Sequence, residues 1–142
     1  MQLKFMSVMV LDQEHALQFY TSVLGFRKMA DLPIGLLRWL TVTSPDGIAG
    51  VELVLEPLNF EPAEIYQKAL FEAGIPAIAL ITTNLHAEVA RLKSKGVQFR
   101  GDPKEMGPIT SVLFEDTCGN FINLVQPAAQ PAAAIDRPAR SR

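Results

Sequence analysis

The residue best suited to chemistry in this sequence is Glu52, which stands in the mostly apolar run "GVELVLEP" of residues 50–57. A second apolar run, "FINLVQP" of residues 121–127, has the same form, because each ends in Pro and carries one polar residue directly before a Leu. The matching residue there is Asn123. A carboxylate among apolar side chains suits a general base, because burial raises its pKa. The same setting is equally consistent with a structural role, in which the Glu52 carboxylate pairs with Arg38 or is hydrogen-bonded to Asn123.

The other reactive or charged side chains are weaker candidates. His15 and His86 fall near the starts of two predicted helices, where we expect them at the surface. Cys118 follows two acidic residues in the turn "EDTCGN", which would raise the pKa of its thiol, so we expect a structural turn residue. Arg38 and Trp39 are neighbours on one predicted strand and point to opposite faces. If Trp39 lines the inner face it forms a stacking wall, and if Arg38 does it binds an anion.

Composition limits the functions open to the chain. It has 142 residues, of which 49% are hydrophobic, so one domain can bury a core. The formal net charge of −2 offers no basic surface for nucleic acid. No apolar run reaches the ~18 residues that a membrane span needs. The single cysteine excludes an internal disulfide and is typical of a reducing compartment, so we expect a cytoplasmic protein.

The elements that must position these residues occur twice. The alternating run "KFMSVMVLD" predicts a strand that ends at a helix N-cap, Asp12, and the helix that follows ends at Gly25. The same order recurs around Asn84 and Gly96. Asn84 follows Asp12 by 72 residues, whereas Gly96 follows Gly25 by 71, so the second helix is one residue shorter. Asn123 also follows Glu52 by 71 residues.

Further strands follow each predicted helix, so each half reads β-α-β-β-β. The fold class is therefore predicted to be α+β, a single domain of residues 1–127 built from tandem βαβββ modules. The modules cover about residues 1–58 and 75–127. A helix of about residues 61–73 links them and is expected to serve packing or a dimer contact. The Ala-, Pro- and Arg-rich residues 128–142 read as a tail.

Three segments carry a resemblance to a known family, namely residues 12–26, 84–96 and 114–124. Residues 12–26 follow the pattern D-x-x-x-A-x-x-F-Y-x-x-V-L-G-F, and residues 114–124, "FEDTCGNFINL", are similar to the ending D-P-x-G-N-x-I-E-L. The chain resembles the vicinal oxygen chelate superfamily, which contains glyoxalase I, bleomycin-resistance and fosfomycin-resistance proteins and extradiol dioxygenases. The resemblance implies two modules that curl around one cavity, and in metal-dependent relatives each module supplies two ligands to a divalent ion.

The four ligand positions carried over from those relatives are Phe5, Glu52, Ala77 and Asn123. Phe5 and Ala77 have no lone pair to give a cation, and the neutral amide of Asn123 is a weak donor. Zn²⁺, Mg²⁺ and Mn²⁺ need several nitrogen, oxygen or sulfur ligands. We therefore expect no metal and no other cofactor, with Asn123 as the remnant of a lost ligand pair.

Strand alternation predicts which side chains share the inner face. They are Phe5, Ser7, Arg38 or Trp39, Glu52, Val54, Ala77, Ala79, Phe121 and Asn123. This mostly apolar face predicts a homodimeric protein that binds a small organic molecule, with a donor or cationic group directed at Glu52, in a cleft between the modules. One alternative is a lyase or isomerase that acts on an α-carbonyl substrate, with Glu52 as base and with a metal or other cofactor that the sequence does not identify. Another is a structural or regulatory module without a ligand. Whether the modules pair within one chain or between chains stays open.

Overall fold

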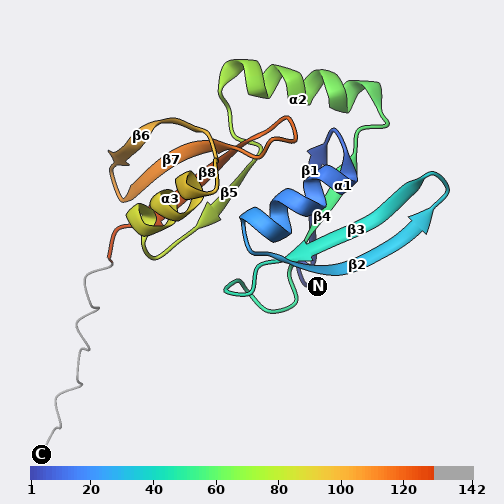
Figure 1. Ribbon diagram of the computed structural model, residues 1–142, viewed down its shortest axis with the longest axis horizontal. Coiled ribbons are helices and arrows are strands. Elements are labelled where there is room, and N and C mark those ends of the chain that lie inside the picture. Colours follow the sequence, from blue (N-terminus) through green and yellow to red (C-terminus); the bar gives the residue numbers. More distant parts are fainter. Residues whose placement is uncertain (130–142) are drawn as a thin grey trace, which may run out of the picture.

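The computed structural model describes residues 1–129, and a helix connects its two modules (Figure 1). The first module contains β1 (Phe5–Val10), α1 (Gln13–Gln18), the π-helix η1 (Phe19–Val23), β2 (Arg27–Ile34), β3 (Leu37–Thr43) and β4 (Glu52–Pro57). The connecting helix is α2 (Glu61–Ala73). The second module contains β5 (Ile78–Ile81), α3 (Leu85–Ser94), β6 (Phe99–Met106), β7 (Ile109–Glu115) and β8 (Phe121–Pro127). The predicted tail lies outside the described residues from residue 130 onward.

Each module forms one four-stranded sheet, and the two sheets have equivalent strand orders, β1-β4-β3-β2 and β5-β8-β7-β6. In each sheet the first and last strands of the module pair in parallel, and the remaining pairs are antiparallel. The α+β fold with tandem βαβββ modules is therefore confirmed.

The first helix of each module begins at a side-chain cap, as the sequence predicts. Asp12 Oδ1 accepts a hydrogen bond from His15 N at 2.7 Å, and Asn84 Oδ1 accepts one from Ala87 N at 3.1 Å. These bonds satisfy amide groups that have no partner within the helix.

The extra residue of the first helix is accommodated as the π-helix η1. Leu24 N donates to Phe19 O at 3.1 Å, which spans five residues instead of the four of an α-helix. The wider turn absorbs one residue, so the buried side chains Leu17 and Tyr20 keep their places in the core.

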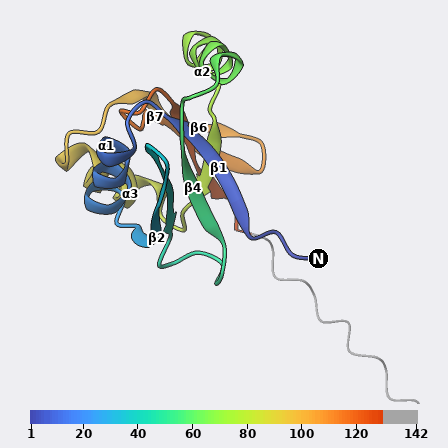
Figure 2. The same cartoon turned by 90° about the vertical axis from the view of Figure 1, so that its right-hand side faces the viewer.

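One hydrophobic core unites the two modules. It includes Val10, Tyr20 and Leu40 from the first module and Leu92 and Phe114 from the second. Both views place α1 and α3 next to each other on one side of the sheets (Figures 1 and 2). Two bonds cross between the modules there: Arg91 Nη1 donates to Val23 O at 3.0 Å, and Lys95 Nζ donates to Ser22 O at 2.8 Å.

The connecting helix α2 is tied to both modules through Gln67, which is only 6% exposed. Its Nε2 donates to Met9 O at 2.9 Å in the first module, and to Cys118 O at 3.2 Å and Asn120 Oδ1 at 3.1 Å in the second. Asn120 in turn donates to Met9 O at 2.8 Å. A buried polar network therefore fixes the β7–β8 turn against the end of β1.

Candidate functional site

The sheet face of the first module that points away from α1 carries half of the predicted site residues. Alternate residues of β1, β3 and β4, among them Val8, Leu40 and Leu55, pack into the core, so the residues between them lie on the opposite face. That face holds Phe5, Ser7, Trp39, Glu52 and Val54, which we call the first half-site. The rings of Phe5 and Trp39 meet edge to face, with centroids 5.3 Å apart.

Glu52 is the polar centre of the first half-site and is 9% exposed. Its Oε1 accepts from Lys4 Nζ at 2.8 Å and its Oε2 accepts from Thr41 Oγ1 at 2.6 Å. The Thr41 hydroxyl accepts from Ala30 N at 3.1 Å, which leaves its proton free for Glu52. The bonds from Lys4 and then Thr41 lower the pKa of Glu52, despite the opposing effect of burial.

This geometry corrects two expectations about Glu52. Its partners are Lys4 and Thr41, not Arg38 or Asn123. Its pKa is lowered, whereas the expectation for a general base was a raised one. Lys4 was not predicted as a partner of Glu52, because it lies just before β1 and strand alternation does not place it on the inner face.

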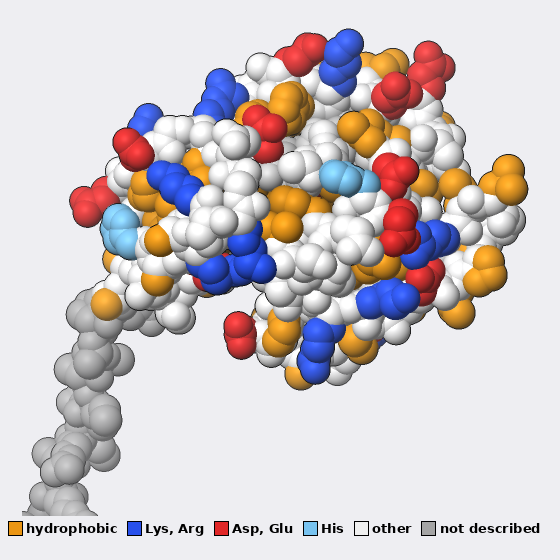
Figure 3. All heavy atoms as spheres, in the orientation of Figure 1, with side chains coloured by type: hydrophobic (Ala, Val, Ile, Leu, Met, Phe, Trp, Pro, Cys, Tyr) orange, Lys and Arg blue, Asp and Glu red, His pale blue; other side chains and the backbone are white. Residues whose placement is uncertain are grey.

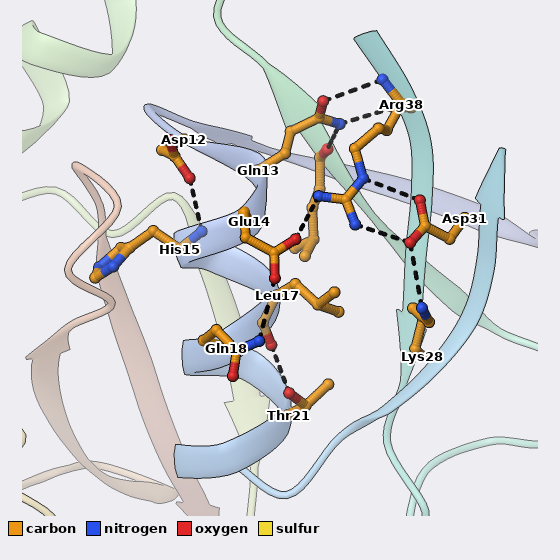
Figure 4. A network of polar contacts seen from close by, with 11 residues as sticks. Asp12, Gln13, Glu14, His15, Leu17, Gln18, Thr21, Lys28, Asp31 and Arg38 are labelled. Carbon is orange, nitrogen blue, oxygen red and sulfur yellow. Dashed lines mark hydrogen bonds and ion pairs between the residues drawn. The ribbon is translucent and has the colours of Figure 1, made fainter. Parts of the chain in front are cut away.

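Arg38 lies on the α1 side of β3, so Trp39 is the neighbour that faces the first half-site (Figure 4). Its guanidinium donates to Asp31 from Nε at 2.9 Å and from Nη2 at 2.8 Å, and to Glu14 Oε2 from Nη1 at 2.7 Å. These hydrogen bonds hold the pKa of Asp31 well below its usual range. Arg38 thus joins β2, β3 and α1, and of the two neighbours it is the one that does not face the first half-site.

The matching face of the second module contains Ala77, Ala79, Phe121 and Asn123, which we call the second half-site. Ile122 and Leu124 of β8 point into the core, so Phe121 and Asn123 lie on the other face. The ring of Phe71 from α2 stacks on Phe121 at 4.5 Å and 8°, and the Arg100 guanidinium lies 5.4 Å from the Phe121 centroid. Phe71 was not among the predicted site residues, because nothing in the sequence of α2 indicates that it packs on β8.

The two half-sites differ in strand register. Glu52 lies opposite Phe5, whereas Asn123 lies opposite Ala79 instead of Ala77. Positions that correspond in sequence therefore do not have corresponding neighbours in space. The side chain of Asn123 is partly exposed, and it makes no side-chain hydrogen bond within residues 1–129.

The residues at the four carried-over positions do not fit a divalent metal. Phe5 and Ala77 offer no donor atom, and both oxygens of Glu52 are engaged. Nowhere in residues 1–129 do three His, Cys, Asp or Glu side chains come together in a group that could hold an ion. Glu52 with Asn123 falls short of the ligand number that these ions require.

The histidines and the cysteine stand outside both half-sites. His15 and His86 are exposed, and His15 Nε2 lies 2.8 Å from Thr117 Oγ1. Burial, followed by the nearby Asp116, raises the pKa of the Cys118 thiol to about 12. Cys118 therefore stays protonated at neutral pH and serves as a buried turn residue.

A pocket of about 380 Å³ opens between the modules on the core side of the first sheet. Its walls include Met6, Phe26 and Leu53 from the first module and Ile78 and Leu80 from the second. Ala79 also lines it, but Phe5, Trp39 and Glu52 do not.

The side of the molecule shown in Figure 3, which carries α1 and α3, has charged side chains of both signs spread across it.

Comparison with known proteins agrees with this architecture. The profile of the Glyoxalase/Bleomycin resistance protein/Dioxygenase superfamily matches residues 2–124. The protein YurT of Bacillus subtilis (strain 168) is 46% identical over 126 residues, which cover 89% of this chain and 99% of YurT. No helix among residues 1–129 has the length and apolar character to cross a membrane.

Two solved structures are also similar. The crystal structure of UcmS2 shares 33% identity at a TM-score of 0.75, covering 88% of this chain and 97% of UcmS2. TnmS3, an antibiotic binding protein from Streptomyces sp. CB03234, shares 32% identity at a TM-score of 0.69, covering 90% of this chain and 97% of TnmS3. With the matched profile and the tandem βαβββ modules, these similarities show that the chain belongs to the glyoxalase/bleomycin resistance protein/dioxygenase superfamily.

Proposed function

We propose that the protein binds a small organic molecule, without a metal, on the sheet faces that carry the two half-sites. The observation that carries this proposal is the ionised, largely buried Glu52 beside the edge-to-face pair of Phe5 and Trp39. Ligand sites for small molecules combine apolar walls with a few convergent polar groups. The first half-site has this composition.

The second half-site supports the same proposal. Ala77 and Ala79 have small side chains that leave room for a ligand, and Asn123 supplies an amide with both donor and acceptor atoms. Phe121 is buried beneath Phe71, which stacks on it, so it supports the floor of this half-site. The similarity to TnmS3, an antibiotic binding protein, supports an organic ligand for this chain as well.

The lyase or isomerase alternative finds less support. A general base works best with a pKa near the operating pH, whereas Lys4 and Thr41 lower the pKa of Glu52. We therefore assign Glu52 the role of binding a ligand and not of removing a proton.

The proposal includes a homodimer. The outer edges of β1 and β5 have no strand neighbour within the described residues. A second copy that covers these edges would satisfy their backbone groups and place one chain's half-site next to the other's.

The test is a titration with a panel of small aromatic molecules, followed through the emission of Trp39, which is the single tryptophan of the chain. We expect saturable binding to the wild type and at least tenfold weaker binding to Ala77→Leu, because the larger side chain fills the second half-site. Ala87→Leu adds the same group at an exposed position of α3 and should bind like the wild type.

Elemental analysis of protein offered Ni²⁺, Zn²⁺ or Mn²⁺ should find well under one equivalent of metal. Stoichiometric metal that Glu52→Ala removes would contradict metal-free binding. Equal affinity of the wild type and Ala77→Leu would exclude the second half-site.

A further inference from the structure

We propose that Lys4 is a built-in occupant of a subsite for an organic cation, and that an ammonium group of the ligand displaces it from Glu52. This inference rests on the proposed function and narrows the class of ligand. The subsite is the position of the Lys4 ammonium group, which lies next to a carboxylate and an aromatic ring.

The contacts of Lys4 define the subsite. Lys4 Nζ lies 2.8 Å from Glu52 Oε1 and 5.4 Å from the centroid of the Phe5 ring. A carboxylate and the face of an aromatic ring are the two groups that proteins use to hold organic cations. Phe5 is also in edge-to-face contact with Trp39, so an apolar surface continues from the subsite.

Glu52 is the fixed member of the ion pair and Lys4 the movable one. The side chain of Glu52 is 11% exposed, and Thr41 holds its second oxygen at 2.6 Å. The side chain of Lys4 is 47% exposed and lies just before the start of β1. Its backbone is anchored separately, because Glu52 N donates to Lys4 O at 2.9 Å. The ammonium group can therefore leave without disturbing the strand.

The charges on this face favour a cation over an anion. Glu56 is the next carboxylate along β4 on the same face, and its Oε2 accepts from Ser7 Oγ at 3.2 Å. When Lys4 moves away, Glu52 leaves a negative charge beside the Phe5 ring, and Glu56 adds a second one further along β4, opposite Met9. An anionic ligand would meet repulsion there, whereas an ammonium group would restore the pairing of Glu52.

The same arrangement explains why the empty protein keeps Lys4 in place. A buried carboxylate without a partner is unfavourable, so some cation must accompany Glu52. A partly exposed lysine meets that need with a weak, replaceable pair. A ligand that brings its own ammonium group and also covers Phe5 and Trp39 gains contacts that Lys4 does not make.

The experiment compares 2-phenylethylamine, which is cationic at neutral pH, with 2-phenylethanol, which has the same skeleton without the charge. Binding is followed by Trp39 emission and by calorimetry. Lys4→Met should bind the amine between about twofold and fivefold more tightly than the wild type, the change that corresponds to the ~0.5–1 kcal/mol of an exposed ion pair. Its affinity for the alcohol should not change. Glu52→Gln should remove the preference for the amine.

Lys28→Met is the matched control. Lys28 forms a similarly exposed ion pair, with its Nζ 3.2 Å from Asp31 Oδ2 and its side chain 49% exposed, but it does not contact Glu52. It should bind both probes like the wild type. An unchanged or weaker affinity of Lys4→Met for the amine would overturn the displacement of Lys4 while leaving the proposed function intact. If neither probe bound any variant, both the proposed function and this inference would fail.

Discussion

At the scale of single residues, neighbours decide what each charged side chain does. Glu52 and Asp31 are both carboxylates with a lowered pKa, but Glu52 faces the first half-site while Asp31 binds Arg38 beside α1. Alternation along β3 predicts that Arg38 and Trp39 point to opposite faces, but it does not say which face each takes. That choice depends on Glu14 and Asp31, which come from other elements and close around the guanidinium group.

The titration of Glu52 gives a direct test at this scale. Its pKa is lowered in the folded protein, so the ionised carboxylate stabilises the fold above the ordinary pKa, and this contribution is lost as the pH falls through the folded value. Lys4→Met removes the largest cause of the shift and should move the carboxyl midpoint upward. Carbon-detected NMR of the Glu52 carboxyl measures that midpoint.

The same titration in Thr41→Val should also move the midpoint upward, but less, because Thr41 is the second cause of the shift. Lys28→Met, whose ammonium group pairs with Asp31, should leave it unchanged. An identical midpoint in the wild type and Lys4→Met would contradict the ion pair.

At the scale of elements, local patterns predicted the helices and strands but not all of their faces. The caps Asp12 and Asn84 could be identified from sequence because their bonds reach only three residues along the chain. The buried residue of α2 is the polar Gln67, whereas the apolar Ile65 is 62% exposed. The partners of Gln67, which are Met9 and Cys118, are far away in sequence, so no periodicity in α2 can indicate them.

Gln67→Ala tests the contribution of that element to stability. The change leaves the carbonyls of Met9 and Cys118 without the amide donor of Gln67 and creates a space beside α2. We expect a loss of about 1–3 kcal/mol in the free energy of unfolding, as for other buried polar groups that lose a partner. Urea denaturation followed by circular dichroism gives the value.

Gln18→Ala is the matched control for this substitution. Gln18 is exposed and donates one bond to Glu14 at 3.2 Å, so its loss should change the free energy of unfolding by less than about 0.5 kcal/mol. Equal effects of the two substitutions would show that the contacts of Gln67 do not stabilise the link between α2 and the modules.

At the scale of the whole molecule, the repeated modules could be predicted from sequence, whereas the relation between their inner faces could not. The shared core, the crossing bonds from α3 and the network around Gln67 hold the modules in one body. Spacing gave Glu52 and Asn123 as equivalents, but the parallel pairing of β5 with β8 shifts the neighbours of Asn123. Register depends on how two distant strands meet, and a single strand does not contain that information.

The whole-molecule prediction is a homodimer. Besides the open edges of β1 and β5, apolar side chains lie exposed on the β2–β3 hairpin, with Leu32 58%, Ile34 60% and Leu36 103% exposed. Hydrophobic side chains gather at the right-hand end of Figure 3, over this hairpin. Apolar groups exposed in this way favour burial against a second copy.

Light scattering at micromolar concentration should therefore give twice the 15.6 kDa of one chain. On dilution, the dimer mass should persist until the protein concentration approaches the dissociation constant of the dimer. A mass of one chain throughout the micromolar range would remove the dimer from the proposed function.

The contact between the π-helix η1 and α3 distinguishes the two modules. The two modules share one strand order, yet the contact between them is one-sided: Arg91 and Lys95 of the second module donate to Val23 and Ser22 of the first. The residue that precedes Lys95 by 71 positions is Leu24, whose side chain has no hydrogen-bond donor. Two copies of the first module would therefore lack this contact. At this contact the second module supplies the hydrogen-bond donors and the first supplies the acceptors, so the two modules are not interchangeable.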